Sequence, residues 1–76
     1  MIKLIDVIAL MPSTGKVIPR SIIWETGQVF EIDKVLDIRK QASTKGGGAG
    51  IRFLCQIKGQ RKSIFLNGYT WFIELD

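Results

Sequence analysis

The feature that most constrains the fold is the distribution of β-branched residues along the chain. Twelve isoleucines and four valines account for 16 of the 76 residues, and they occur in short runs separated by turn-forming residues. β-Branched residues favour strands, and runs this short predict an all-β protein rather than a helical one. Because 76 residues are about half the usual length of a domain, we expect one domain over residues 1–76.

The turn signals divide the chain into six expected strands, at residues 2–11, 17–24, 28–39, 51–58, 62–66 and 69–75. Pro19 lies inside the second of these and has no N–H to donate, which predicts an edge or a bulged position. The dipeptide Asn67-Gly68 is well suited to a two-residue type I′ turn, so we expect it to join the last two strands. Residues 40–50 are rich in glycine and are expected to form a flexible loop.

Six short strands in one small domain must bury a common apolar face, and curling into a barrel does this without long open edges. We therefore predict a small, mostly antiparallel barrel of five to six strands. The apolar alternation of the third strand breaks at Lys34 and Val35, where a bend or a bulge is expected. An SH3-like barrel is favoured, and an OB-like barrel, which normally carries a helix where this chain has its glycine-rich loop, is the alternative. The expected core includes Trp24, Phe30, Phe53 and Ile57.

Residue content excludes several classes of chemistry. The chain has no histidine and one cysteine, Cys55, which rules out an intramolecular disulfide, a histidine-ligated metal and an imidazole base. Cys55 alternates with apolar residues in its strand, so we expect a buried thiol. The carboxylates of Glu31, Asp33 and Asp37 share a strand face and are interpreted as a solvated edge. We expect no catalytic residue, no metal and no cofactor, and therefore a protein that is not an enzyme.

No apolar run approaches the roughly 20 residues that a membrane-spanning helix needs. The chain also opens without the pattern of a secretory signal peptide. We therefore expect a cytoplasmic protein without a membrane partner.

The basic residues are concentrated in the second half of the chain, although the net charge is only +4. No acidic residue falls between residues 38 and 73, whereas that stretch contains Arg39, Lys40, Lys45, Arg52, Lys58, Arg61 and Lys62. A segregated positive field favours a polyanionic partner. Tyr69 and Trp71 lie in the last expected strand, where an exposed ring is able to stack on a base. These nine residues are the candidate nucleic-acid-binding site; the alternative interpretation is an ordinary solvated surface.

The charge pattern predicts a small binding module, with DNA or RNA as the first candidate partner and the role of an accessory protein. The alternative is a protein-interaction or self-associating module, which binds a protein partner or forms a homodimer. Such a module uses a strand edge near Pro19 or the C-terminal hairpin.

The most distinctive stretch is residues 22–39, Ile-Ile-Trp-Glu-Thr-Gly-Gln-Val-Phe-Glu-Ile-Asp-Lys-Val-Leu-Asp-Ile-Arg. Together with residues 50–57 and 71–74, it resembles a pattern of short uncharacterised proteins from Gram-positive bacteria. The resemblance covers most of the chain and implies a bacterial cytosolic protein. It implies no activity and no site residue.

Overall fold

The computed structural model describes residues 1–41 and 50–74, and these residues form eight strands and no helix. The strands are β1 (Ile2–Leu4), β2 (Asp6–Leu10), β3 (Ile18–Ile23), β4 (Val29–Glu31), β5 (Lys34–Lys40), β6 (Ile51–Ile57), β7 (Gln60–Asn67) and β8 (Thr70–Glu74). The all-β prediction is confirmed.

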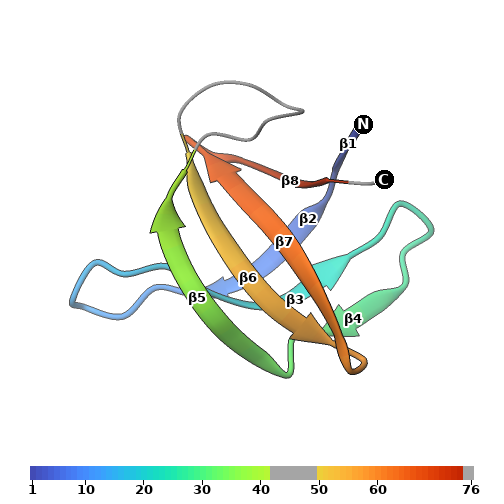
Figure 1. Ribbon diagram of the computed structural model, residues 1–76, viewed down its shortest axis with the longest axis horizontal. Helices are drawn as coiled ribbons and strands as arrows, with labels where there is room; N and C mark the ends of the chain where they lie inside the picture. Colours follow the sequence, from blue (N-terminus) through green and yellow to red (C-terminus); the bar gives the residue numbers. More distant parts are fainter. Residues whose placement is uncertain (42–49, 75–76) are drawn as a thin grey trace.

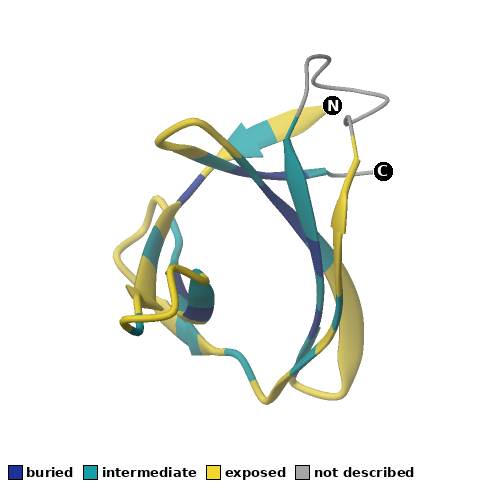
Figure 2. Ribbon diagram, turned by 90° about the vertical axis from the view of Figure 1, so that its left-hand side faces the viewer, coloured by how far each residue is buried: buried dark blue, intermediate teal, exposed yellow. Residues whose placement is uncertain are grey.

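The strands form two antiparallel sheets (Figure 1). The larger sheet has the order β1-β8-β7-β6-β5 and the smaller has the order β2-β3-β4. Figure 2 shows them on opposite sides of the interior, with buried segments in each. The prediction of a single barrel of five to six strands is therefore wrong. The described residues form eight strands, and these are divided between two sheets that do not close into one barrel.

The first division occurs at a corner inside the expected strand 2–11, which becomes β1 and β2. The corner residue is Ile5, whose side chain is 7% exposed in the core. Its N–H donates a hydrogen bond to the carbonyl of Trp71 in β8 (3.2 Å). At this corner the chain leaves the edge of the larger sheet and enters the smaller one.

The second corner divides the expected strand 28–39 into β4 and β5. The N–H of Ile32 donates to the carbonyl of Arg20 in β3 (2.9 Å), and the N–H of Asp33 donates to the carbonyl of Gln56 in β6 (2.8 Å). Two consecutive residues thus bond to different sheets. The predicted bend lies at Ile32 and Asp33, just before Lys34. The register between β5 and β6 also shifts between Val35 and Asp37, so the strand is irregular at the predicted position as well.

Pro19 lies in β3, which is the central strand of the smaller sheet and not an edge strand. The register between β2 and β3 shifts between Ile8 and Ala9, and Pro19 pairs with Ala9 just after this shift. The bulged form of the prediction is therefore confirmed, and the edge form is wrong. β4 pairs only with residues 21–23 of β3, so it does not extend as far as the proline.

The last hairpin turn lies one residue later than predicted. Asn67 pairs with Thr70, so the turn residues are Gly68 and Tyr69 rather than Asn67 and Gly68. Of these two, only Gly68 has a positive φ (63°), which is the pattern of a type II′ turn, whereas a type I′ turn needs two. Tyr69 is consequently at the tip of the turn and fully exposed.

The core lies between the sheets and contains Ile5, Ile22, Phe53, Cys55, Ile57, Ile64 and Ile73. The ring of Trp71 packs on Phe53, with 5.4 Å between their centroids. The Cys55 thiol is fully buried, as predicted, and donates to the Phe53 carbonyl (3.6 Å). Burial raises the pKa of this thiol to about 11.

The predicted flexible loop at residues 40–50 begins later than expected, because Lys40 is still part of β5. The N–H of Gln41 donates to the carbonyl of Gly50 (2.9 Å) and joins the two ends of this segment. Residues 42–49, on which the rest of the prediction falls, lie outside the described residues.

Candidate functional site: a cleft between two hairpins

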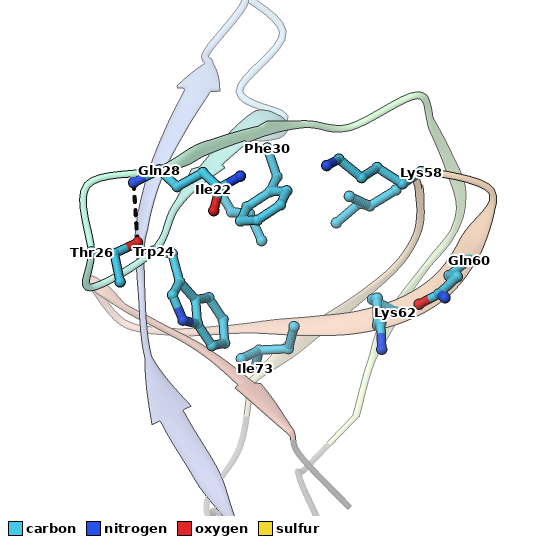
Figure 3. A pocket seen from close by; sticks show the side chains of 10 residues that line it. Ile22, Trp24, Thr26, Gln28, Phe30, Lys58, Gln60, Lys62 and Ile73 are labelled. Atoms are coloured by element: carbon cyan, nitrogen blue, oxygen red, sulfur yellow. Dashed lines mark hydrogen bonds between the residues drawn. The ribbon is translucent and has the colours of Figure 1, made fainter.

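A cleft of about 430 Å³ opens between the two sheets (Figure 3). One wall is the hairpin of β3 and β4, which belongs to the smaller sheet, and the other is the hairpin of β6 and β7, which belongs to the larger. Ile73 of β8 also lines it. The cleft exists because the two corners bring these hairpins, which belong to separate sheets, face to face.

The β3–β4 hairpin supplies the aromatic wall. Ile22 pairs with Phe30 across the ladder, and the N–H of Trp24 donates to the carbonyl of Gln28 (2.9 Å). Gly27, with a φ of 87°, allows the chain to turn back within this short loop. Alternate residues of a strand point to the same side, so the side chains of both pairs face the cleft.

The β6–β7 hairpin supplies the cationic wall, with Ile57, Lys58, Gln60 and Lys62. Its turn residues are Lys58 and Gly59, whose φ values of 50° and 75° fit a type I′ turn. Lys58 is the only non-glycine residue with a positive φ in the part of the chain that the structure describes.

Each aromatic ring of the cleft has a lysine against it. The Nζ of Lys58 lies 5.0 Å from the centre of the Phe30 ring, and the Nζ of Lys3 lies 5.4 Å from the Trp24 ring. Lys3 also pairs with Glu25 (2.7 Å) and does not line the cleft. Within residues 1–41 and 50–74, Lys58 has no ion pair, and no carboxylate lines the cleft. The cleft is therefore positively charged.

The structure brings two of the predicted cations, Lys58 and Lys62, into one site and places the arginines elsewhere. Arg52 pairs with Arg39 on the face of the larger sheet opposite the core. The carboxylate of Asp37 forms an ion pair with Arg39, and Arg52 donates to the hydroxyl of Ser63 (3.0 Å). The positive charges are thus divided between the two faces of the sheet.

The other predicted residues do not join the cleft. Lys40 is exposed at the end of β5, and Tyr69 is exposed at the tip of the β7–β8 turn. Arg61 pairs with Gln56 and is exposed on β7. Trp71 is half-buried and packs against the core. Lys45 lies outside the described residues.

The two rings that line the cleft, Trp24 and Phe30, were expected only as core residues, and the structure shows both half-buried. The signal that identifies them in the sequence is their position in a tight hairpin. With the turn at Thr26-Gly27, residues 24, 28 and 30 fall on one face, and a surface residue such as Gln28 on that face indicates that the face is not fully covered.

Within the described residues, no group of three or more histidine, cysteine or carboxylate side chains is arranged to hold a metal ion. The same part of the chain contains no helix that is long and apolar enough to cross a membrane.

No protein-family model, curated protein or solved structure matches the chain. The resemblance to short Gram-positive proteins therefore stays a prediction.

Proposed function

We propose that this protein is a small non-enzymatic module that binds single-stranded nucleic acid, and that the cleft between the two hairpins is the binding site. The observation that carries the proposal is the presence of Trp24, Phe30, Lys58 and Lys62 in the lining of one cleft. Single strands are bound by aromatic rings on which bases stack and by cations that contact the phosphates. The cleft combines both elements within the reach of one or two nucleotides.

The size and polarity of the cleft support this proposal. Its volume of about 430 Å³ falls in the range of roughly 300–1,000 Å³ that is typical of ligand sites. The amides of Gln28 and Gln60 line it beside the apolar side chains. An amide offers both donors and acceptors, which suits the edge of an unpaired base.

The remaining basic residues have a secondary role in the proposal. Arg61 precedes Lys62 on β7, so its exposed side chain points to the opposite face of the strand and does not line the cleft. Its charge therefore acts on a nucleic acid only at longer range. Arg39, Lys40, Lys45 and Arg52 contribute a more diffuse attraction that raises the rate of association.

The proposal is tested by titrating labelled single-stranded DNA and RNA oligonucleotides at salt concentrations from about 50 to 300 mM. We expect affinity to fall with salt, by a logarithmic slope of about 0.7 for each phosphate contacted. The double variant Lys58→Glu/Lys62→Glu should weaken binding by more than tenfold. Its matched control, Arg39→Glu/Lys40→Glu, makes the same charge change away from the cleft and should have a smaller effect. Absence of binding by the unmodified protein at the lowest salt contradicts the proposal.

A second candidate function is supported by exposed apolar residues on β2 and just after it. Ile8, Leu10 and Met11 are 52%, 51% and 72% exposed. Large apolar side chains exposed along an edge strand are typical of protein-interaction or self-association sites. Analytical ultracentrifugation over a wide concentration range tests self-association. We expect Ile8→Ser/Leu10→Ser to reduce any association that is found, and a protein that remains monomeric throughout argues against a homodimer.

We infer further that the fold is closer to the SH3-like class than to the OB-like class. The only stretch with room for the helix of an OB-like barrel is the glycine-rich segment, whose composition disfavours a helix. A cytoplasmic location is proposed from the same resemblance that implies a bacterial protein.

A further inference from the structure

Lys58 adopts a backbone conformation that its side chain does not favour. Its φ is 50°, in the left-handed region, and Gly59 follows with a φ of 75°. Type I′ turns prefer Asn-Gly, because the asparagine side chain tolerates this region whereas a lysine gains nothing there. A residue held in such a region by its surroundings often serves a purpose other than local stability.

The side chain of Lys58 suggests what that purpose is. It extends toward Phe30, and its ammonium group lies 5.0 Å from the centre of that ring (Figure 3). A cation at this distance over an aromatic face forms a cation–π contact. The contact occupies a ring that lines the cleft, so a base can stack on this face of Phe30 only if Lys58 moves.

The same lysine is also a suitable partner for a phosphate. It is exposed and has no ion pair within the described residues. A charge-assisted hydrogen bond from an ammonium group to a phosphate is stronger than a cation–π contact at an exposed site. A ligand with both an aromatic base and a phosphate can stack its base on Phe30 in place of the ammonium group. Its phosphate can at the same time give that ammonium group the ion pair that it lacks.

We propose that Lys58 is a displaceable cover of the cleft. In the free protein its ammonium group lies on the Phe30 ring; in the complex it leaves the ring for a phosphate, and the base of the same nucleotide takes its place. This inference rests on the proposed function and adds the unit that is recognised, which is one unpaired nucleotide. Inorganic phosphate provides only the partner for the ammonium group of Lys58, and an unphosphorylated nucleoside provides only the base that stacks on Phe30.

The test compares Lys58→Asn with Lys62→Asn. Asparagine suits the type I′ turn, so Lys58→Asn removes the ammonium group and uncovers Phe30 while the hairpin is retained. Lys62→Asn removes the same charge from the same cleft, but Lys62 makes no ring contact within the described residues. Binding is measured with adenosine, which lacks phosphate, by NMR titration of the Phe30 ring protons. Binding of a short single-stranded oligonucleotide is measured by anisotropy.

We expect Lys58→Asn to bind adenosine about two- to fivefold more tightly, because the base no longer displaces an ammonium group. The same variant should bind the oligonucleotide several-fold more weakly, with a salt slope smaller by about 0.7. Lys62→Asn should also lower the slope for the oligonucleotide, without any gain for adenosine. A damaged hairpin weakens both ligands, so opposite signs distinguish a cover from a structural role.

Two results overturn the inference in different ways. If the unmodified protein binds the oligonucleotide but Lys58→Asn does not bind adenosine more tightly, the cover is wrong and the proposed function stands. If the unmodified protein binds no single-stranded oligonucleotide at low salt, the proposed function fails and the inference fails with it. Thermal denaturation of Lys58→Asn should show a melting temperature no lower than that of the unmodified protein, which confirms that the variant is folded.

Discussion

The two ends of the interior contain similar residues in different arrangements. At one end, which we call the closed end, Trp71 packs directly on Phe53, which is 1% exposed. Trp71 itself is half-buried and also lines a separate hollow with Tyr69 and Thr70. At the open end, Trp24 and Phe30 are half-buried on the wall of a cleft, and each has a lysine against its ring. The fully buried Phe53 ring fills the interior, whereas Trp24 and Phe30 line a cleft and leave a surface for a ligand.

This difference separates stability from binding. The stabilisation from an apolar side chain grows with the area that folding removes from water. Residues of the closed end are therefore expected to determine whether the chain folds, and residues of the open end to determine what it binds. Changes at Phe53, Cys55, Trp24 and Tyr69 are expected to test this division, in order of decreasing effect.

The closed end is tested most severely by Phe53→Ala. Removal of a fully buried ring from a core costs about 3–5 kcal/mol. A domain of this size has a free energy of unfolding of about 5 kcal/mol, so most of the stability is lost. Urea denaturation followed by circular dichroism measures the change. A loss below about 1 kcal/mol would show that this end is not the structural core.

The buried thiol of Cys55 predicts a loss of stability at high pH. Its pKa is raised by burial from 9.0 to about 11, so between these values the unfolded chain loses the proton and the folded chain keeps it. The contribution is fully present below pH 9 and is lost as the pH rises through 11. A shift of two pKa units corresponds to about 2–3 kcal/mol. Urea denaturation of the unmodified protein and of Cys55→Ala over this pH range measures it; equal pH dependence in both contradicts the assignment.

The open end is tested by Trp24→Ala. Because the side chain is half-buried, we expect a smaller loss of stability than for Phe53→Ala. Loss of one base-stacking ring should weaken single-strand binding by about 1–3 kcal/mol. Trp71→Ala is the matched control, because it removes the same type of side chain from the closed end. We expect this variant to lose stability, while the molecules that remain folded bind the single strand with nearly unchanged affinity. The reverse pattern would exchange the roles of the two ends.

The smallest effect is expected for Tyr69→Ala. This ring is fully exposed at the tip of the β7–β8 turn and lines neither the core nor the cleft. Stability should change by no more than about 0.5 kcal/mol, and oligonucleotide affinity should be nearly unchanged. A clear loss of affinity, measured by anisotropy, would extend the binding surface beyond the cleft and restore Tyr69 to the site.

The fold class was predictable because strands leave a local record in the sequence. In β6, the alternation of Ile51, Phe53, Cys55 and Ile57 with more polar residues marks both the strand and its buried face. The corner at Ile5 leaves no such record. It depends on a hydrogen bond to Trp71, which is remote in sequence, so local alternation reads β1 and β2 as one strand.

The last hairpin shows a local preference overridden by packing between strands. Asn67-Gly68 favours a type I′ turn on its own. The observed register instead places Phe65 opposite Phe72, where the rings stack with centroids 5.2 Å apart. The turn moves by one residue as a result, and turn propensity alone does not reveal this.

The candidate site was predictable only in part, because its two walls come from different sheets. Charge segregation identified Lys58 and Lys62, which are cations in a stretch without carboxylates. It did not identify Trp24 or Phe30, since hydrophobicity predicts that a ring is covered but not which part of the chain covers it. The meeting of the two hairpins is a property of the tertiary structure.

β1 and β8, the first and last of the described strands, lie side by side, with Ile2 opposite Glu74 (Figure 1). A short linker is therefore able to join them, and the chain can be circularly permuted. New ends at Gly68-Tyr69 would preserve both walls of the cleft, whereas new ends at Lys58-Gly59 would cut the cationic wall. These two permutants have the same amino-acid composition, so a difference in binding between them would come from the cut in the cationic wall of the cleft and not from the permutation itself.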